Sequence, residues 1–240
     1  MRTYVIAALT GLACLALAGT ASAGENDGVV WELNYTTTKA KTLTGFSASI
    51  DSTGTADATG KPRAARRVTI TFAAGTRFNT RVRPTCSAAV LRSDGPDGCP
   101  SRSRIGTGSA EAVTGLTGID PISLDIRAFN ARNGILFHVT GAAGGLPLTL
   151  VLEGKLRGRK LTVDVPRQPL PTPFGEGILT KFNVRVGRIS SGRGRKKRNF
   201  ATTPSTCRNG RWTTEALFQY DDGRIRVRDT DTCRRTRSRR

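Results

Sequence analysis

The sequence predicts an all-β protein: an antiparallel β-sandwich, jelly-roll-like and stapled by two disulfides. Three observations favour this class. Apolar and polar residues alternate in segment after segment, which is the period of a half-buried strand. Short turns rich in Gly, Pro, Asn and Asp separate these segments. After the first 23 residues no segment carries a clear 3.6-residue apolar stripe, whereas four cysteines follow them.

Residues 1–23 have the pattern of a secretory signal peptide. Arg2 provides a positive start, residues 4–19 are apolar, and residues 21–23, Ala-Ser-Ala, form a small-residue cleavage site. The apolar run is shorter than the roughly 20 residues that a membrane-spanning helix needs, and no second such run follows it. We therefore expect a secreted protein, extracellular or associated with the cell wall, without a transmembrane segment.

The strand patterns predict one principal domain. An N-terminal strand pair lies within residues 24–50, and residues 51–65, rich in Thr, Ala and Gly, are expected to form a loop or linker before a β-sandwich of residues 66–233. The clearest alternating segments lie at 29–35, 68–72, 122–126, 182–186 and 212–220.

Three tight hairpins are expected within the sandwich. They lie around Asn133 and Gly134, around Gly158, and around Asp222 and Gly223. Asn, Asp and Gly favour such turns because they tolerate the positive φ that a short connection requires.

Four cysteines remain beyond the signal peptide, namely Cys86, Cys99, Cys207 and Cys233. In an exported chain an even number indicates disulfides. Of the three pairings we favour Cys86 with Cys99 and Cys207 with Cys233, because each encloses a hairpin-like segment and the crossed pairings close longer loops. Residues 87–98 are too rich in Gly, Pro and Asp to build a core, so the bond is expected to replace packing there. Zinc is the alternative use of four cysteines, but no C-x-x-C is present and we expect no metal.

Positive charge dominates the chain, with 38 Lys and Arg against 18 Asp and Glu and a formal net charge of +20. Residues 190–200 are predicted to form a basic loop, and residues 234–240 a disordered basic tail without apolar residues. Both can neutralise polyanions by releasing counterions. The predicted polyanion-binding residues are Arg193, Arg195, Lys196, Lys197 and Arg198 in the loop, and Arg234, Arg235, Arg237, Arg239 and Arg240 in the tail.

Other interpretations of this charge stay open. Arg224, Arg226 and Arg228 alternate on one strand and add a basic face. Codon bias in a GC-rich genome, however, also raises the number of Arg residues independently of any ligand. Sequence-specific nucleic-acid binding is not favoured, because the aromatic residues share the alternate positions of the aliphatic ones and are expected in the core. An anionic cell-envelope polymer or polysaccharide is a candidate partner, and a merely solvated basic surface is the other interpretation of the charge.

No catalytic residue or cofactor is predicted. His138 is the only histidine, on a strand face opposite Ile135, Phe137 and Val139, and no Gly-x-Ser-x-Gly motif accompanies it. A glycosidase needs two paired carboxylates. Glu111, Glu153, Glu176 and Glu215 are scattered along the chain, and no sequence feature groups two of them as such a pair. The Asp-rich segments at 94–97 and 229–231 lack the closing Glu of a calcium loop and are better explained as turns.

Three segments together are similar to a group of uncharacterised exported proteins of high-GC actinobacteria. They are FAAGTRFNTRVRPTCSAAVL (72–91), CPSRSRIGTGSAEA (99–112) and PSTCRNGRWTTEALFQYDDG (204–223), the last followed by Cys233. The resemblance implies a disulfide-stapled, β-rich extracellular domain over residues 66–233. It implies no activity and no catalytic residue, and the basic loop and tail lie outside the matching segments.

These observations predict a secreted, non-enzymatic extracellular or cell-envelope module that attaches to anionic polymers through its basic loop and tail. Two alternatives remain. One is a hydrolase of carbohydrate or ester on the same scaffold, which requires His138 or two carboxylates to converge in a pocket. The other is a domain for a specific protein or carbohydrate partner in which the basic charge is incidental.

Overall fold

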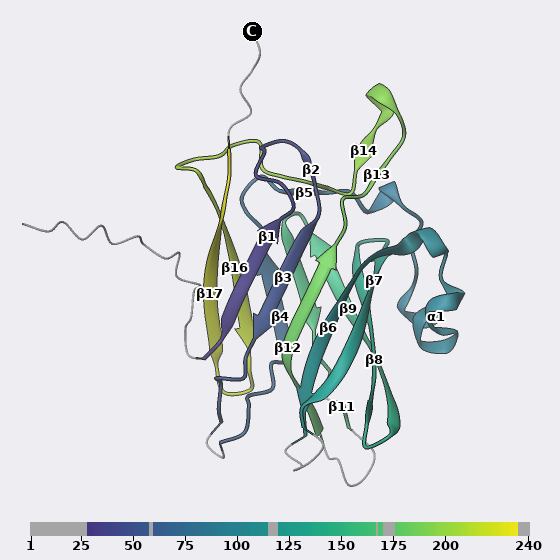
Figure 1. Cartoon of the computed structure of the whole chain (residues 1–240), viewed down its shortest axis with the longest axis vertical. Helices are drawn as coiled ribbons and strands as arrows, with labels where there is room; N and C mark the ends of the chain where they lie inside the picture. Colours follow the sequence, from purple (N-terminus) through teal and green to yellow (C-terminus); the bar gives the residue numbers. More distant parts are fainter. Residues whose placement is uncertain (1–27, 58–59, 115–119, 167, 170–175, 235–240) are drawn as a thin grey trace, which may run out of the picture.

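The computed structural model describes residues 28–57, 60–114, 120–166, 168–169 and 176–234. Within them, one antiparallel sheet of twelve strands forms most of the molecule, in the order β1-β3-β12-β6-β7-β8-β9-β10-β4-β16-β17, with β11 paired to β12 (Figure 1). The strands are β1 (Val30–Tyr35), β3 (Phe46–Asp51), β4 (Arg67–Thr71), β6 (Arg104–Val113), β7 (Ile122–Ala131), β8 (Gly134–Ala143), β9 (Leu146–Arg157), β10 (Lys160–Asp164), β11 (Gln168–Pro169), β12 (Glu176–Val186), β16 (Arg211–Gln219) and β17 (Arg224–Thr232).

The sheet curls until its two edge strands, β1 and β17, lie side by side. Two carboxylates close the seam between them. The backbone N–H of Leu33 donates to Asp229 Oδ2 at 2.8 Å, and that of Tyr35 donates to Asp231 Oδ2 at 2.7 Å. The two halves of the sheet therefore face each other as layers, and the predicted antiparallel β-sandwich is confirmed.

The core lies between the layers, and its residues are those that alternate in the sequence. On β16 the side chains of Trp212, Ala216 and Phe218 are buried, while their neighbours point outward. All three expected hairpins are present, with Ala131 opposite Gly134, Arg157 opposite Lys160 and Gln219 opposite Arg224. Gly158 has a φ of 58°, the left-handed conformation that its turn requires.

The N-terminal strands form one edge of the main sheet, because β3 pairs with β12 as well as with β1. The segment after β3 leads across to β4 in the other layer. It is anchored by the buried side chains of Ser52 and Thr55 and by Arg63, whose guanidinium lies 4.2 Å from the ring centre of Tyr220. A segment expected as a linker thus connects the two layers of one body.

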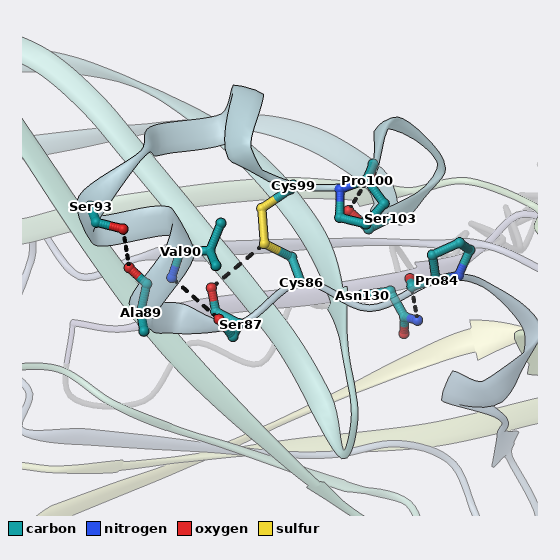
Figure 2. The surroundings of a disulfide bond; sticks show 10 residues. All are labelled: Pro84, Cys86, Ser87, Ala89, Val90, Ser93, Cys99, Pro100, Ser103 and Asn130. Carbon is teal, nitrogen blue, oxygen red and sulfur yellow. Dashed lines mark hydrogen bonds between the residues drawn. A yellow bond between two sulfur atoms is a disulfide. The ribbon is translucent and has the colours of Figure 1, made fainter.

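Both predicted disulfides, Cys86–Cys99 and Cys207–Cys233, are present. The segment inside the first is not hairpin-like, however. It forms the short helix α1 (Ala88–Ser93) and a 3-10 turn (Gly95–Gly98), and Ser87 caps the helix by accepting a hydrogen bond from Val90 N at 3.2 Å (Figure 2). By chain entropy alone, closing 13 residues contributes about 3 kcal/mol.

The expectation that this segment builds no core was wrong. Leu91 of α1 is only 1 % exposed and packs on Phe129, Leu136 and Val151, on the outer face of β7, β8 and β9. A helix of six residues is too short to display a helical period in the sequence, so only its contact with the sheet reveals it. Among the described residues, no helix has the length and apolarity required to cross a membrane.

A small three-stranded sheet covers one end of the sandwich. It consists of β2 (Leu43–Thr44), β15 (Ala201–Thr202) and β5 (Arg77–Phe78). Beneath it, Phe72 packs edge-on against Phe46 and Phe78, with ring centres 5.0 and 4.7 Å apart. The hairpin of β13 (Ser190–Ser191) and β14 (Arg198–Asn199) projects from the same end, at the top of Figure 1.

The seam between β1 and β17 is expected to make stability depend on pH. Burial raises the pKa of Asp231, and the backbone amides of Tyr35 and Thr232 oppose that rise. A carboxyl group with a raised pKa in the folded state favours folding at low pH, and this contribution is lost as the pH rises through the folded pKa. Relative to an Asp231→Asn variant, the unmodified protein should gain stability from about pH 7 to about pH 4, measured by urea unfolding.

Asp231→Ala is the companion variant. It leaves the N–H of Tyr35 without its acceptor, which should cost about 1–3 kcal/mol at either pH. An identical difference between the unmodified protein and Asp231→Asn at both pH values would contradict the assignment.

Candidate polyanion-binding end

Three segments that are distant in the sequence meet at the end covered by the small sheet. We call residues 36–45, 72–85 and 187–211 the basic end. Their backbones are tied together, because Asn79 N donates to Phe200 O at 2.7 Å and Lys41 N donates to Pro204 O at 2.9 Å. These segments contain 13 Lys and Arg and no Asp or Glu, namely Lys39, Lys41, Arg77, Arg81, Arg83, Arg188, Arg193, Arg195, Lys196, Lys197, Arg198, Arg208 and Arg211.

The charges of the basic end are available to a ligand. All of these side chains except the partly buried Arg83 are exposed. Within the described part of the chain, none of the 13 forms an ion pair. Solvent ions or an anionic partner must therefore neutralise these positive charges.

The opposite end of the sandwich differs in this respect. There Arg66 pairs with Asp221 at 2.8 Å and with Glu176 at 3.2 Å, and Arg63 pairs with Asp222. The hydrogen bond to Asp221 is the main cause of the raised pKa of Arg66. These arginines of the opposite end, unlike the cations of the basic end, therefore have acidic partners.

The predicted loop residues lie on the projecting hairpin. Arg193, Arg195, Lys196, Lys197 and Arg198 are all exposed, around the 3-10 turn Gly194–Lys196. Gly192 has a φ of 77°, and a side chain there would come within 2.5 Å of the backbone oxygen of Lys196. The turn therefore needs glycine, and the hairpin presents its charges from a defined backbone rather than from an irregular loop.

Of the predicted tail residues, only Arg234 is described, and it joins the basic end. Its N–H donates to Thr38 O at 2.7 Å, and its carbonyl accepts from Ala40 N at 3.2 Å. The neighbouring Cys207–Cys233 bond links it to the third segment. Arg235, Arg237, Arg239 and Arg240 lie outside the described residues, as does the predicted signal peptide.

Arg224, Arg226 and Arg228 do share the outer face of β17, as their alternation predicted. Glu215 on β16 lies between them, 3.6 Å from Arg226 and 3.1 Å from Arg228. Part of this charge is therefore neutralised locally, and these residues do not extend the basic end.

Sequence reasoning missed seven exposed residues of the basic end: Lys39, Lys41, Arg77, Arg81, Arg188, Arg208 and Arg211. They are scattered over three segments and form no run. A weak signal was present, because each segment lacks acidic residues altogether.

Among the described residues, none forms a hydrogen bond or ion pair with His138 that would mark it as a catalytic base. It lies on the outer face of β8 opposite Arg127 of β7, is 5 % exposed, and its Nδ1 has no partner among the described atoms. Burial, and secondarily the charge of Arg127, lower its pKa. His138 lines neither of two pockets found in the described part of the molecule. Within the described residues, no three His, Cys, Asp or Glu side chains gather as metal ligands would.

A shallow polar depression of about 460 Å³ crosses the outer face of β1, β3, β12 and β6. Hydroxyl and amide side chains line it, together with Arg185, and Glu32 is the only carboxylate among the described residues that do so. A glycosidase needs two carboxylates facing one sugar ring. The depression therefore lacks the pair that the hydrolase alternative requires.

No protein-family model, curated protein or solved structure matched the chain in our comparisons. The similarity to exported actinobacterial proteins therefore stays a prediction from the sequence. Any assignment of function depends on the geometry described above.

Proposed function

We propose that this protein is a secreted, non-enzymatic module of the extracellular space or cell envelope that attaches to anionic polymer through its basic end. The observation that carries the proposal is the meeting of 13 Lys and Arg from three segments, without an Asp or Glu among them. Cations held on one surface release several counterions together when a polyanion binds, and this release drives affinity.

The shape of the basic end favours an extended polymer over a small anion. Its charges lie on a projecting hairpin, on the small sheet below it and on the neighbouring segments, so they are distributed over one end of the molecule (Figure 1). Arginine also suits phosphate and carboxylate groups, because its planar guanidinium can donate two parallel hydrogen bonds. Acidic polysaccharides and phosphate-containing wall polymers offer such groups at regular spacing.

The test replaces the five charges of the hairpin, Arg193, Arg195, Lys196, Lys197 and Arg198, with Gln. Affinity for heparin, used as the probe, should fall by at least about tenfold at low salt. The slope of log affinity against log salt should also become shallower, by about 0.9 for each anionic group that the variant no longer neutralises. Fluorescence titration at several salt concentrations measures both quantities.

A matched control removes the same amount of charge elsewhere. Arg67, Lys155, Arg224, Arg226 and Arg228 are exposed, lie on the outer faces of β4, β9 and β17, and can be replaced with Gln together. This control should keep most of the affinity and slope of the unmodified protein. Equal losses in the two variants would show that net charge, and not the basic end, determines binding, and would overturn the proposal.

A further inference from the structure

An apolar cavity of about 130 Å³ lies between the two layers of the sandwich, and nothing in the proposed function uses it. It is lined by side chains of β3, β6, β7, β8 and β12, and by those of β4, β9, β10 and β16. Its rim includes Ala65, Arg66 and Glu176, which lie at the end opposite the basic end.

The side chains around the cavity are not fully packed. Ile50, Leu148, Leu150, Leu179 and Phe182 point toward the core but are only partly buried. Tightly packed core residues of the same sandwich, such as Trp31 and Phe72, have no exposed surface at all. A well-packed interior leaves few voids larger than a water molecule, so a space beside inward-facing apolar groups is a candidate site for an apolar ligand.

Several polar groups of the lining already have partners within the protein. Ser52 Oγ donates to Thr180 O at 2.9 Å, and Thr180 Oγ1 donates to Glu111 O at 3.3 Å. At the rim, Lys181 pairs with Glu111 at 2.9 Å, and Arg66 with Asp221 at 2.8 Å. Most side chains of the described lining are apolar, so they cannot compensate a charged ligand group for its lost hydration, whereas an apolar ligand needs no such compensation.

We infer that the cavity binds a small uncharged apolar molecule, namely one aromatic ring or a short hydrocarbon chain. Its volume is close to that of engineered apolar cavities of about 150 Å³, which stay dry and bind benzene. Removal of the ligand's apolar surface from water supplies the affinity. The site is separate from the basic end, so one molecule can hold an apolar ligand while it is attached to a polymer.

Toluene is the probe for the test. The purified protein should bind toluene saturably in ligand-observed NMR, and its thermal unfolding midpoint should rise with toluene concentration, because a ligand that binds only the folded state stabilises it. An absence of saturable binding would overturn the inference.

Two leucine substitutions on β6 make a matched pair. Ala112 lines the cavity and Ser109 points outward into solvent. Ala112→Leu fills part of the space and should weaken toluene binding by at least about tenfold, while Ser109→Leu should stay within about twofold of the unmodified protein. Equal affinity in all three proteins would place toluene elsewhere and overturn the inference.

A third variant keeps the test decisive if Ala112→Leu does not fold. Leu150→Ala enlarges the cavity, so naphthalene, which is too large for the unmodified cavity, should bind to this variant alone. Failure of Leu150→Ala to gain naphthalene binding would count against the inference. Heparin affinity should be unchanged in every cavity variant, so this site and the proposed polymer attachment can fail independently.

Discussion

Affinity of the purified protein for heparin is expected to fall by about a thousandfold when the salt concentration rises from about 50 to about 200 mM. This magnitude assumes that about six of the cations engage anionic groups at a charge density like that of a nucleic-acid duplex, which gives a slope of about −5 in log affinity against log salt. The basic end offers 13 Lys and Arg and no competing acid, so six such pairings use fewer than half of them.

Binding to an uncharged dextran of similar size is the control, and it should be undetectable throughout the salt range. A slope near zero for heparin would contradict attachment by charge. If the slope stays steep after the five hairpin charges are replaced, the other cations of the basic end make the main contacts with heparin. Arg77, Arg81 and Arg188 are then the next residues to replace.

Replacement of Phe72 by Ala should destabilise the protein by about 3–5 kcal/mol. Phe72 has no exposed surface, and its ring lies edge-on to those of Phe46 and Phe78. Its loss removes buried apolar surface and leaves a cavity in the cluster that joins the small sheet to the sandwich. The free energy of unfolding in urea measures the effect.

Leu146→Ala is the control for this substitution. Leu146 is 41 % exposed, so its truncation should change the free energy of unfolding by less than about 0.5 kcal/mol. A loss below about 1 kcal/mol for Phe72→Ala would show that the phenylalanine cluster is not tightly packed. Because the cluster underlies β2, β15 and β5, Phe72→Ala should also loosen the base of the basic end.

Local sequence patterns were sufficient to predict the strands and the turns between them. The alternation of Ile122, Leu124 and Ile126 predicted which face of β7 is buried, and Gly158 marked its hairpin through a backbone conformation that few other residues adopt. The two disulfides were also predictable, since each joins cysteines that are near in the sequence. Such features depend on a residue and its close neighbours, which the sequence displays directly.

Other features depend on contacts between distant residues. The carboxylates of Asp229 and Asp231 suggested only a turn, because their partners, the N–H groups of Leu33 and Tyr35, lie almost 200 positions earlier in the chain. The helix α1 was missed because it is recognisable only by the burial of Leu91 on the sheet.

The sequence by itself determined the β class, the strand faces, the cystine pairs and the five charges of the hairpin, because each is a property of neighbouring residues. Only the tertiary structure decided that segments around Lys39, Arg77 and Arg208 would join those charges, and that the two layers would leave an apolar space beside Leu150. The physical reason is the same in both cases. Charge clustering and packing voids are set by distances between side chains in space, and a curled sheet brings together residues that the chain keeps far apart.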